Sequence, residues 1–185
     1  MKARNAVVFA AVAAVGVFVM RTADERKYRS TAADALRRQG RLLLSQEQQA
    51  MADIITGVFA DAGMRWLADA AIANAYAESL LDTTAIGDAG AAVGLFQLND
   101  ARPSAAGYGM SVAERQDPVE NTRRIVDVAR VAGADRLKNS PGYRKVVWFA
   151  REVERCAACG HNAGDSELYR RCEIAARLFG MSALS

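Results

Sequence analysis

Several common signals are missing from this chain of 185 residues, and each absence narrows the function. Basic residues form no stripe in the main body: residues 1–41 hold nine Lys or Arg against three Asp or Glu, whereas residues 42–185 hold fifteen against eighteen. The body therefore lacks the charge pattern of a nucleic-acid-binding protein, and we expect no nucleic-acid partner. There is also no internal repeat and no run alternating apolar with polar residues, as a half-buried strand would. The length favours one compact domain with an appendage, and about half the residues are hydrophobic, which is enough to form a core.

Cysteine and histidine are scarce, and they lie close together near the C-terminus. Cys156, Cys159 and Cys172 flank His161, the only histidine. Three sulfurs and one nitrogen could bind Zn²⁺, but the single residue between Cys159 and His161 is tight for a tetrahedral site. In an oxidising compartment, a disulfide such as Cys159–Cys172 would leave one thiol over. Buried free thiols are the third alternative, and we predict neither a metal nor another cofactor.

A long uncharged run occurs only at the N-terminus. Residues 6–20 carry no charge, Lys2 precedes them and Arg21 follows. As a helix they span roughly 22 Å, less than the roughly 30 Å hydrocarbon core, but both flanking cations can reach the lipid headgroups. We predict that residues 1–23 form a transmembrane anchor, with residues 6–20 in the lipid bilayer. The alternatives are a cleaved signal peptide and a buried core helix.

The rest of the chain divides into a charged segment and a domain. Residues 24–44 are charged and helix-prone, and we interpret them as a solvated juxtamembrane stalk. Residues 45–185 contain several helix starts: Ser45 with Gln48 as a capping box, Asp117-Pro118, Ser140-Pro141 and Asp165. We predict a mostly α-helical domain here, with at most a small β-hairpin within residues 84–100.

Glu78 stands out because it lies on an apolar helix face. A helix over residues 65–80 places Leu67, Ala71, Asn74 and Glu78 on one side, since they are spaced by four, three and four. Burial and the negative end of the helix dipole both favour a protonated carboxyl group, which could donate a proton to a leaving oxygen. The alternative is that Glu78 reaches solvent or pairs with an arginine in the core.

The stretch around Glu78 resembles the catalytic core of soluble lytic transglycosylases and goose-type lysozymes, particularly versions found in phage. Three motifs carry the resemblance: Glu78-Ser79 at a helix end, Gly94-Leu95-Phe96-Gln97 with Phe in place of the family's Met, and the string DPVEN at residues 117–121. The resemblance covers roughly residues 46–180. It implies a lysozyme-like (lytic transglycosylase) helical fold and identifies Glu78 as the catalytic acid.

The resemblance also implies a substrate and a set of contacts. The family cleaves the MurNAc-GlcNAc β-1,4 bond of peptidoglycan with one carboxyl group and forms a 1,6-anhydro product. Glycines near the groove would allow close approach of the glycan, although ordinary turn formation explains them equally well. Residues expected to contact the substrate are Ser79, Gly94, Phe96, Gln97, Asn99, Tyr143 and Asn162.

Two features of the sequence leave alternatives open. Asp88 could serve as a second carboxylate that holds a water, which would make the protein a hydrolytic lysozyme, but its Gly-Asp-Ala-Gly context is typical of a turn. The family's Tyr-Asn-x-Gly motif is replaced by HNAG at residues 161–164, so Tyr143 or Tyr108 would have to supply a tyrosine.

Taken together, the sequence predicts a membrane-anchored enzyme whose catalytic domain faces the periplasm or cell wall. Its partners would be peptidoglycan glycan strands, the lipid bilayer and other virion or membrane proteins. The role would be to open the wall when a phage enters or leaves its host. The alternatives are a hydrolytic muramidase and a catalytically inactive wall-binding structural protein of the virion.

Overall fold

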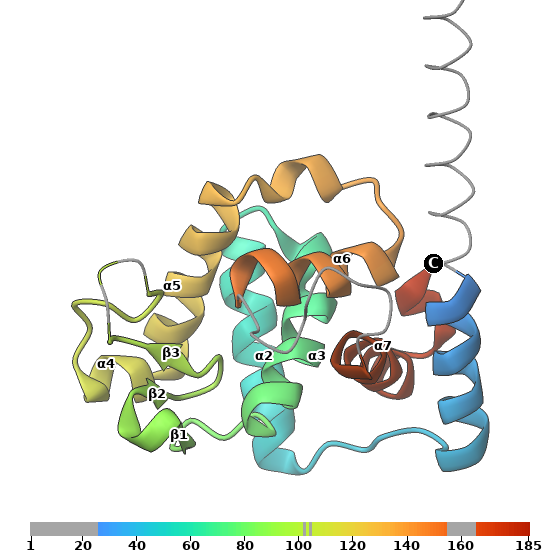
Figure 1. The fold of residues 1–185 in the computed structure, drawn as a ribbon, viewed down its shortest axis with the longest axis horizontal. Coiled ribbons are helices and arrows are strands. Elements are labelled where there is room, and N and C mark those ends of the chain that lie inside the picture. The colour runs from blue at the N-terminus through green and yellow to red at the C-terminus, as the bar shows by residue number, and fades with distance from the viewer. Residues whose placement is uncertain (1–25, 102, 104, 155–165) are drawn as a thin grey trace, which may run out of the picture.

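The computed structural model describes residues 26–101, 103, 105–154 and 166–185. These residues are mostly helical and include one small three-stranded sheet, which confirms the predicted helical class. Figure 1 places the sheet at one end of the molecule and the helix over residues 26–39 at the other, with α2 and α3 between them.

Two helices begin at the predicted caps. Ser45 precedes α2 (Gln46–Asp61); its hydroxyl accepts from the Gln48 backbone N–H, and its own N–H donates to the Gln48 side chain. Asp117 precedes α5 (Pro118–Val131), and its carboxylate accepts from two backbone N–H groups of the first turn. Each cap satisfies donors that the first helical turn leaves unpaired, so short sequence signals were sufficient to place both starts.

Helix α3 (Ala68–Ser79) follows a 3₁₀ turn at Arg65–Leu67 and lies at the centre of the domain. It packs against α2, α6 (Gly142–Trp148) and α7 (Ser166–Phe179). Nearly every residue of α3 up to Ala75 is buried, as expected for a helix surrounded by others. Most of these residues are alanines, whose short side chains let the neighbouring helices approach closely.

Shorter elements complete the helical part. A π-helical turn, Phe149–Val153, continues the chain beyond α6. The short helix α4 (Val112–Gln116) lies beside the sheet and precedes α5. Further 3₁₀ turns occur at Asp88–Gly90, Ala134–Leu137 and Met181–Leu184.

The sheet lies where a hairpin was expected but has one more strand. It contains β1 (Ile86–Gly87), β2 (Ala92–Val93) and β3 (Leu98–Asn99), all antiparallel, with Ile86 opposite Val93 and Leu98 also opposite Val93. The third strand forms because the chain reverses after Val93 and returns Leu98 to its side.

The helix over residues 26–39 packs on the body instead of standing free in solvent. Tyr28 lies among aromatic rings, with its ring centroid 6.0 Å from that of Tyr143 in α6 and 4.8 Å from that of Tyr169 in α7. The residues of this helix buried by the packing are Tyr28, Ala32 and Ala35. The expectation of a solvated stalk is therefore wrong for this helix, because its apolar face shares the core of the domain.

The membrane prediction concerns residues that the structure does not describe. Over residues 26–101, 103, 105–154 and 166–185, no helix combines the length and apolar character needed to cross a bilayer. The anchor predicted over residues 1–23 lies outside these ranges, so it stays a prediction.

Candidate active site

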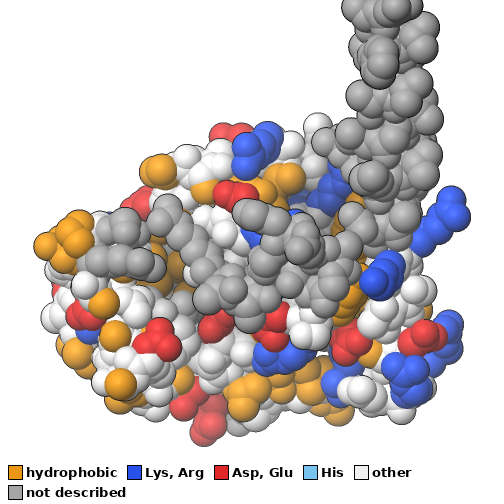
Figure 2. Space-filling view, in the orientation of Figure 1, with side chains coloured by type: hydrophobic (Ala, Val, Ile, Leu, Met, Phe, Trp, Pro, Cys, Tyr) orange, Lys and Arg blue, Asp and Glu red, His pale blue; other side chains and the backbone are white. Residues whose placement is uncertain are grey.

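An open groove of about 1130 Å³ separates the helical centre from the sheet region. One wall is formed by the end of α3, the π-helical turn and α7, and the other by β3, the turn before it and α5. Figure 2 shows acidic side chains on this face of the molecule. The lining includes five side chains used below: Glu78, Asp88, Gln97, Glu154 and Arg171.

Glu78 lies in the last turn of α3, at the edge of the groove. Ala71 and Asn74, on the same helix face, are fully buried, whereas the Glu78 side chain is 26% exposed. The predicted face is therefore buried, as nearly all of α3 is up to Ala75, and its last member reaches the groove. Beyond it, Leu80 adopts a left-handed conformation that ends the helix.

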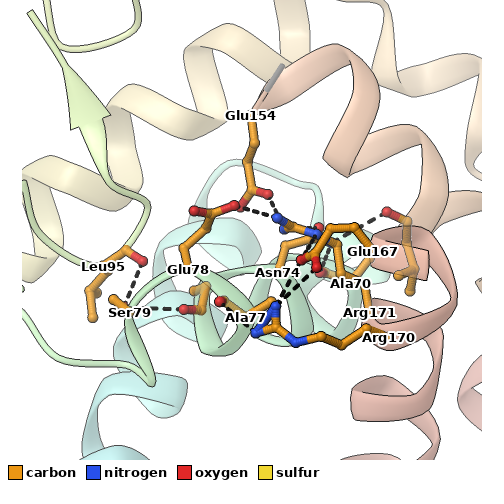
Figure 3. A network of polar contacts seen from close by, with 12 residues as sticks. Ala70, Asn74, Ala77, Glu78, Ser79, Leu95, Glu154, Glu167, Arg170 and Arg171 are labelled. Carbon is orange, nitrogen blue, oxygen red and sulfur yellow. Dashed lines mark hydrogen bonds and ion pairs between the residues drawn. The ribbon is translucent and has the colours of Figure 1, made fainter. Parts of the chain in front are cut away.

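The carboxylate of Glu78 forms an ion pair with Arg171 of α7. The Arg171 side chain is only 2% exposed, so this is the pairing with a core arginine that the sequence left open as an alternative. The same guanidinium also bonds Glu154, and its Nε lies 3.2 Å from a carboxylate oxygen of Glu167. Figure 3 shows the three acidic side chains around this one cation.

Asn74 of α3 holds the Arg171 guanidinium in position through its side-chain amide. Its side-chain nitrogen donates to the backbone oxygens of Ala70 at 2.7 Å and Val146 at 3.3 Å. Its side-chain oxygen then accepts from Arg171 Nη1 at 2.7 Å. Because both ends of the amide are bonded, Asn74 orients the guanidinium toward Glu78.

Glu154 follows the π-helical turn and is much more buried than Glu78. Its side chain is 3% exposed, and its Oε1 atom has no hydrogen-bond partner among the described residues. Burial raises the pKa of Glu154 to about 8, with further increases from the charges of Glu78 and Glu167, although Arg171 acts in the opposite direction. The Glu154 carboxyl group is therefore mostly protonated at neutral pH.

Ser79 joins the two sequence motifs. Its hydroxyl lies 2.9 Å from the backbone oxygen of Leu95 and 3.1 Å from that of Ala75. The bond to Leu95 fixes the end of α3 against the Gly94–Gln97 turn. Ser79 is buried and does not line the groove, so it acts on the substrate at most by placing the turn.

Gly94 and Asn121 hold the same turn from the other side. Gly94 has a φ of +83°, and a Cβ atom there would lie 2.0 Å from the Arg115 backbone oxygen. Asn121, the last residue of DPVEN, donates to that oxygen at 2.5 Å and accepts from the Phe96 N–H at 3.2 Å. A glycine is thus required at position 94 because the Arg115 backbone leaves no room for a side chain. Through Asn121, the DPVEN motif holds the Gly94–Gln97 motif in place.

The remaining residues of the turn line the groove while bonding to backbone. Gln97 Nε2 donates to the oxygens of Ala85 and Gly94, both at 3.0 Å. Phe96 contributes to the lining although it is largely buried, with its ring 6.0 Å from that of Phe149. The Gln97 amide thus helps to hold the backbone of the turn in place.

Asn99 and Asp88 lie together on the sheet side of the groove. Asn99 Nδ2 is 3.4 Å from a carboxylate oxygen of Asp88, and its Oδ1 accepts from the Ala101 N–H at 2.8 Å. Asp88 has a φ of +48°, which is typical of a turn residue, and it also lines the groove. Both sequence-based interpretations of Asp88 therefore remain compatible with its position.

Tyr143 was expected to contact the substrate, but it lies outside the groove lining. It is buried in α6, packs against Tyr28 and accepts a hydrogen bond from Arg144 Nε at 2.9 Å. The expectation rested on the missing tyrosine of the family's third motif, and the packing of α6 instead buries Tyr143 in the core. Asn162 and His161 lie outside the described residues.

Cys172 is buried in α7 beside Arg171, and burial raises the pKa of its thiol to about 12. It forms no disulfide with another described residue. Within the described ranges, no cluster of three metal-binding side chains is found. Cys156 and Cys159 lie outside these ranges, so the three alternatives for the cysteines remain predictions.

Sequence reasoning missed Arg171 and Glu154. A signal for Arg171 existed, because it follows Leu168 by three residues and therefore shares the buried stripe of the last helix. An arginine on such a stripe needs a carboxylate partner. Glu154 had no comparable signal, since its burial depends on the contact between separate elements.

Comparisons with known proteins identify no relative of this chain. No protein-family model matches the chain, and no match was found among curated proteins or solved structures.

Proposed function

We propose that this protein is a peptidoglycan lytic transglycosylase with a lysozyme-like fold, and that Glu78 is its catalytic acid and base. One observation carries the proposal: Glu78 reaches an open groove whose lining also includes Phe96, Gln97 and Asn99. The motifs that suggested the family in sequence are thus joined in space through Ser79 and Asn121.

The groove suits a polymer with many hydroxyl and amide groups. Its volume of about 1130 Å³ exceeds the usual range for pockets that enclose small ligands, and it is open rather than closed. Both charged and apolar side chains line it, including the Phe96 ring and the Asn99 amide. Such a surface can hold several sugar rings by stacking and hydrogen bonding.

In the first step, a protonated Glu78 gives its proton to the glycosidic oxygen as the bond from that oxygen to C1 of the muramic acid breaks. The acetamido oxygen of the same sugar stabilises the developing positive charge at C1. Arg171 bonds Glu78 and therefore stabilises the carboxylate that results.

In the second step, Glu78 acts as the base. Its carboxylate takes the proton of the C6 hydroxyl while O6 bonds to C1, which closes the 1,6-anhydro ring. Glu78 ends protonated as it began, and no water is consumed. One carboxyl group thus suffices, unlike hydrolases that need a second one to activate water or to act as nucleophile.

Asp88 supports a second candidate, a hydrolytic lysozyme. It lines the same groove as Glu78, so it could hold a water for attack at C1. Digestion of purified cell-wall sacculi with the full-length protein, followed by mass spectrometry, separates the candidates. Anhydro-muropeptides support the transglycosylase, reducing-end muropeptides support the lysozyme, and intact sacculi would indicate an inactive wall-binding protein.

Replacing Glu78 tests its role directly. Glu78→Gln retains the shape but removes the transferable proton, so turnover on sacculi should fall by at least roughly 10²–10⁴-fold. The fold should persist, because Arg171 keeps Glu154 and Glu167 as partners. Thermal melting provides the control for folding.

Asp88→Asn is the matched comparison. It should change activity little if O6 is the nucleophile, and nearly as much as Glu78→Gln if water is. A Glu78→Gln protein that remains folded and close to full activity would contradict the assignment of this residue.

A further inference from the structure

We propose that Glu154 is a positioning residue that stores a proton for Glu78, and that the two carboxyl groups exchange this proton beside Arg171. The inference deepens the proposed function and rests on it. Glu154 does not act on the glycan itself; its role is to supply Glu78 in the protonated form that the first step requires.

The geometry brings the two carboxyl groups to one guanidinium. Arg171 Nη2 bonds Glu78 and Arg171 Nη1 bonds Glu154. Figure 3 shows the two side chains, one from α3 and one after the π-helical turn, pointing toward the same end of Arg171. A cation held between two carboxyl groups can stabilise whichever of them is ionised, so the proton can change sides while the ion pair is kept.

The burial of the two groups differs and sets where the proton rests. Glu154 is 3% exposed with an unpartnered Oε1 atom, whereas Glu78 is 26% exposed and faces the groove. Ionising Glu154 costs more free energy because it is the more buried group. Glu154 therefore holds the proton when no substrate occupies the groove.

The two neighbouring acidic residues act in the same direction as burial. Glu78 on α3 and Glu167 on α7 both disfavour its negative charge, and Arg171 alone favours it. Glu167 is itself paired with Arg170 at 2.9 Å. Arg170 and Arg171 thus supply two positive charges for three carboxyl groups, and burial favours the proton that balances the excess on Glu154.

Substrate binding would then move the proton. A sugar ring over Glu78 removes water from its carboxylate and so disfavours the charged form. The O–H bond of Glu154 breaks and an O–H bond of Glu78 forms, while Arg171 keeps its pair with the newly ionised Glu154. The transfer is balanced within the pair and needs no further reactant.

The first test compares the pH dependence of kcat/KM on sacculi for the full-length protein and Glu154→Gln. We expect the unmodified protein to lose activity above about pH 8. In Glu154→Gln the alkaline limb should move to lower pH, and kcat/KM at pH 7 should fall roughly tenfold or more. Glu120→Gln, an exposed change outside the groove, is the control and should keep the original profile. A Glu154→Gln profile that superimposes on the original would overturn the proposal.

A second test does not require activity. Carbon-13 NMR of the glutamate carboxyl groups in the full-length protein would report the titration of Glu154 with Glu78 intact and in Glu78→Gln. Because the substitution removes a neighbouring negative charge, Glu154 should titrate at lower pH in the variant. An identical titration in both proteins would show that the groups do not share a proton, even in an active enzyme.

A protein that never cleaves sacculi would reject the proposed function, whereas this titration would still decide whether the pair is coupled.

Discussion

Arg171 carries one positive charge against the carboxyl groups of Glu78, Glu154 and Glu167. Arg170 also pairs with Glu167, so ionisation of all three would leave an excess of one negative charge, which is expensive in a region largely shielded from water. Protonation of the most buried group, Glu154, relieves that cost. The cluster is therefore pH-sensitive as a direct consequence of having too few cations.

This arrangement predicts that Glu154 makes the stability of the protein depend on pH. The unfolded chain releases this proton near its ordinary value of 4.5, but the folded protein releases it near 8. The folded state holds the extra proton between these values, so the free energy of unfolding falls as pH rises, by up to about 1.4 kcal/mol per pH unit.

Urea unfolding of the full-length protein and Glu154→Gln between pH 4.5 and 8 provides the measurement. The unmodified protein should lose stability relative to the variant as pH rises, since the amide does not titrate. Parallel stability curves would contradict the burial and charge argument for Glu154.

At the level of elements, the turn before β3 and the first residue of β3 are held by three helices. Ser79 binds its backbone from the end of α3, Asn121 from α5, and Arg115 of α4 donates to the Leu98 oxygen at 3.1 Å. The turn therefore forms part of the rigid frame of the groove. Its glycine, Gly94, lies so close to the Arg115 backbone that no side chain fits there.

Gly94→Ala should consequently destabilise the protein more than an ordinary glycine substitution. Gly109 is a matched control, since its φ of +81° nearly equals the +83° of Gly94 but open space surrounds it. Both alanine variants incur roughly 1–2 kcal/mol for the left-handed backbone, and Gly94→Ala should cost roughly 1–3 kcal/mol more through overpacking. Equal losses in denaturant unfolding would contradict the close contact at Gly94.

At the scale of the whole molecule, the helix over residues 26–39 extends the domain beyond the predicted boundary at residue 45. Besides the contacts of Tyr28, the Leu42 N–H donates to the Arg177 oxygen at 3.0 Å, and Arg177 Nη1 donates to Gln39 at 2.7 Å. The charged residues of this segment suggested a tether, but its apolar face is matched to the outer side of α6 and α7.

Tyr28→Ala tests whether this packing is part of the fold. Removing a buried aromatic side chain typically costs about 3–5 kcal/mol. At roughly 2–4 °C per kcal/mol for a protein of this size, the melting temperature of the full-length protein should fall by about 10 °C. Tyr108→Ala is the control, because Tyr108 is 49% exposed and its loss should matter little. A free tether would instead make the two variants melt alike.

The helix starts and the identity of the buried face of α3 were determined by the sequence itself. Ser45 and Asp117 cap helices through bonds to backbone within three residues, so their effect requires no distant partner. The placement of Glu78 after Ala71 and Asn74 on one face follows from helical periodicity in the same way.

The partners of Glu78 were decided only by the tertiary structure. Arg171 lies 93 residues further along the chain, and Glu154 reaches the same guanidinium only because the end of the π-helical turn meets α3 and α7. Whether a carboxyl group is ionised depends on burial and on nearby charges, and both arise from contacts between elements. The same reason explains why the burial of Tyr28 and Tyr143 was not predicted. Periodicity shows that a helix face is apolar, whereas packing determines which other element covers that face.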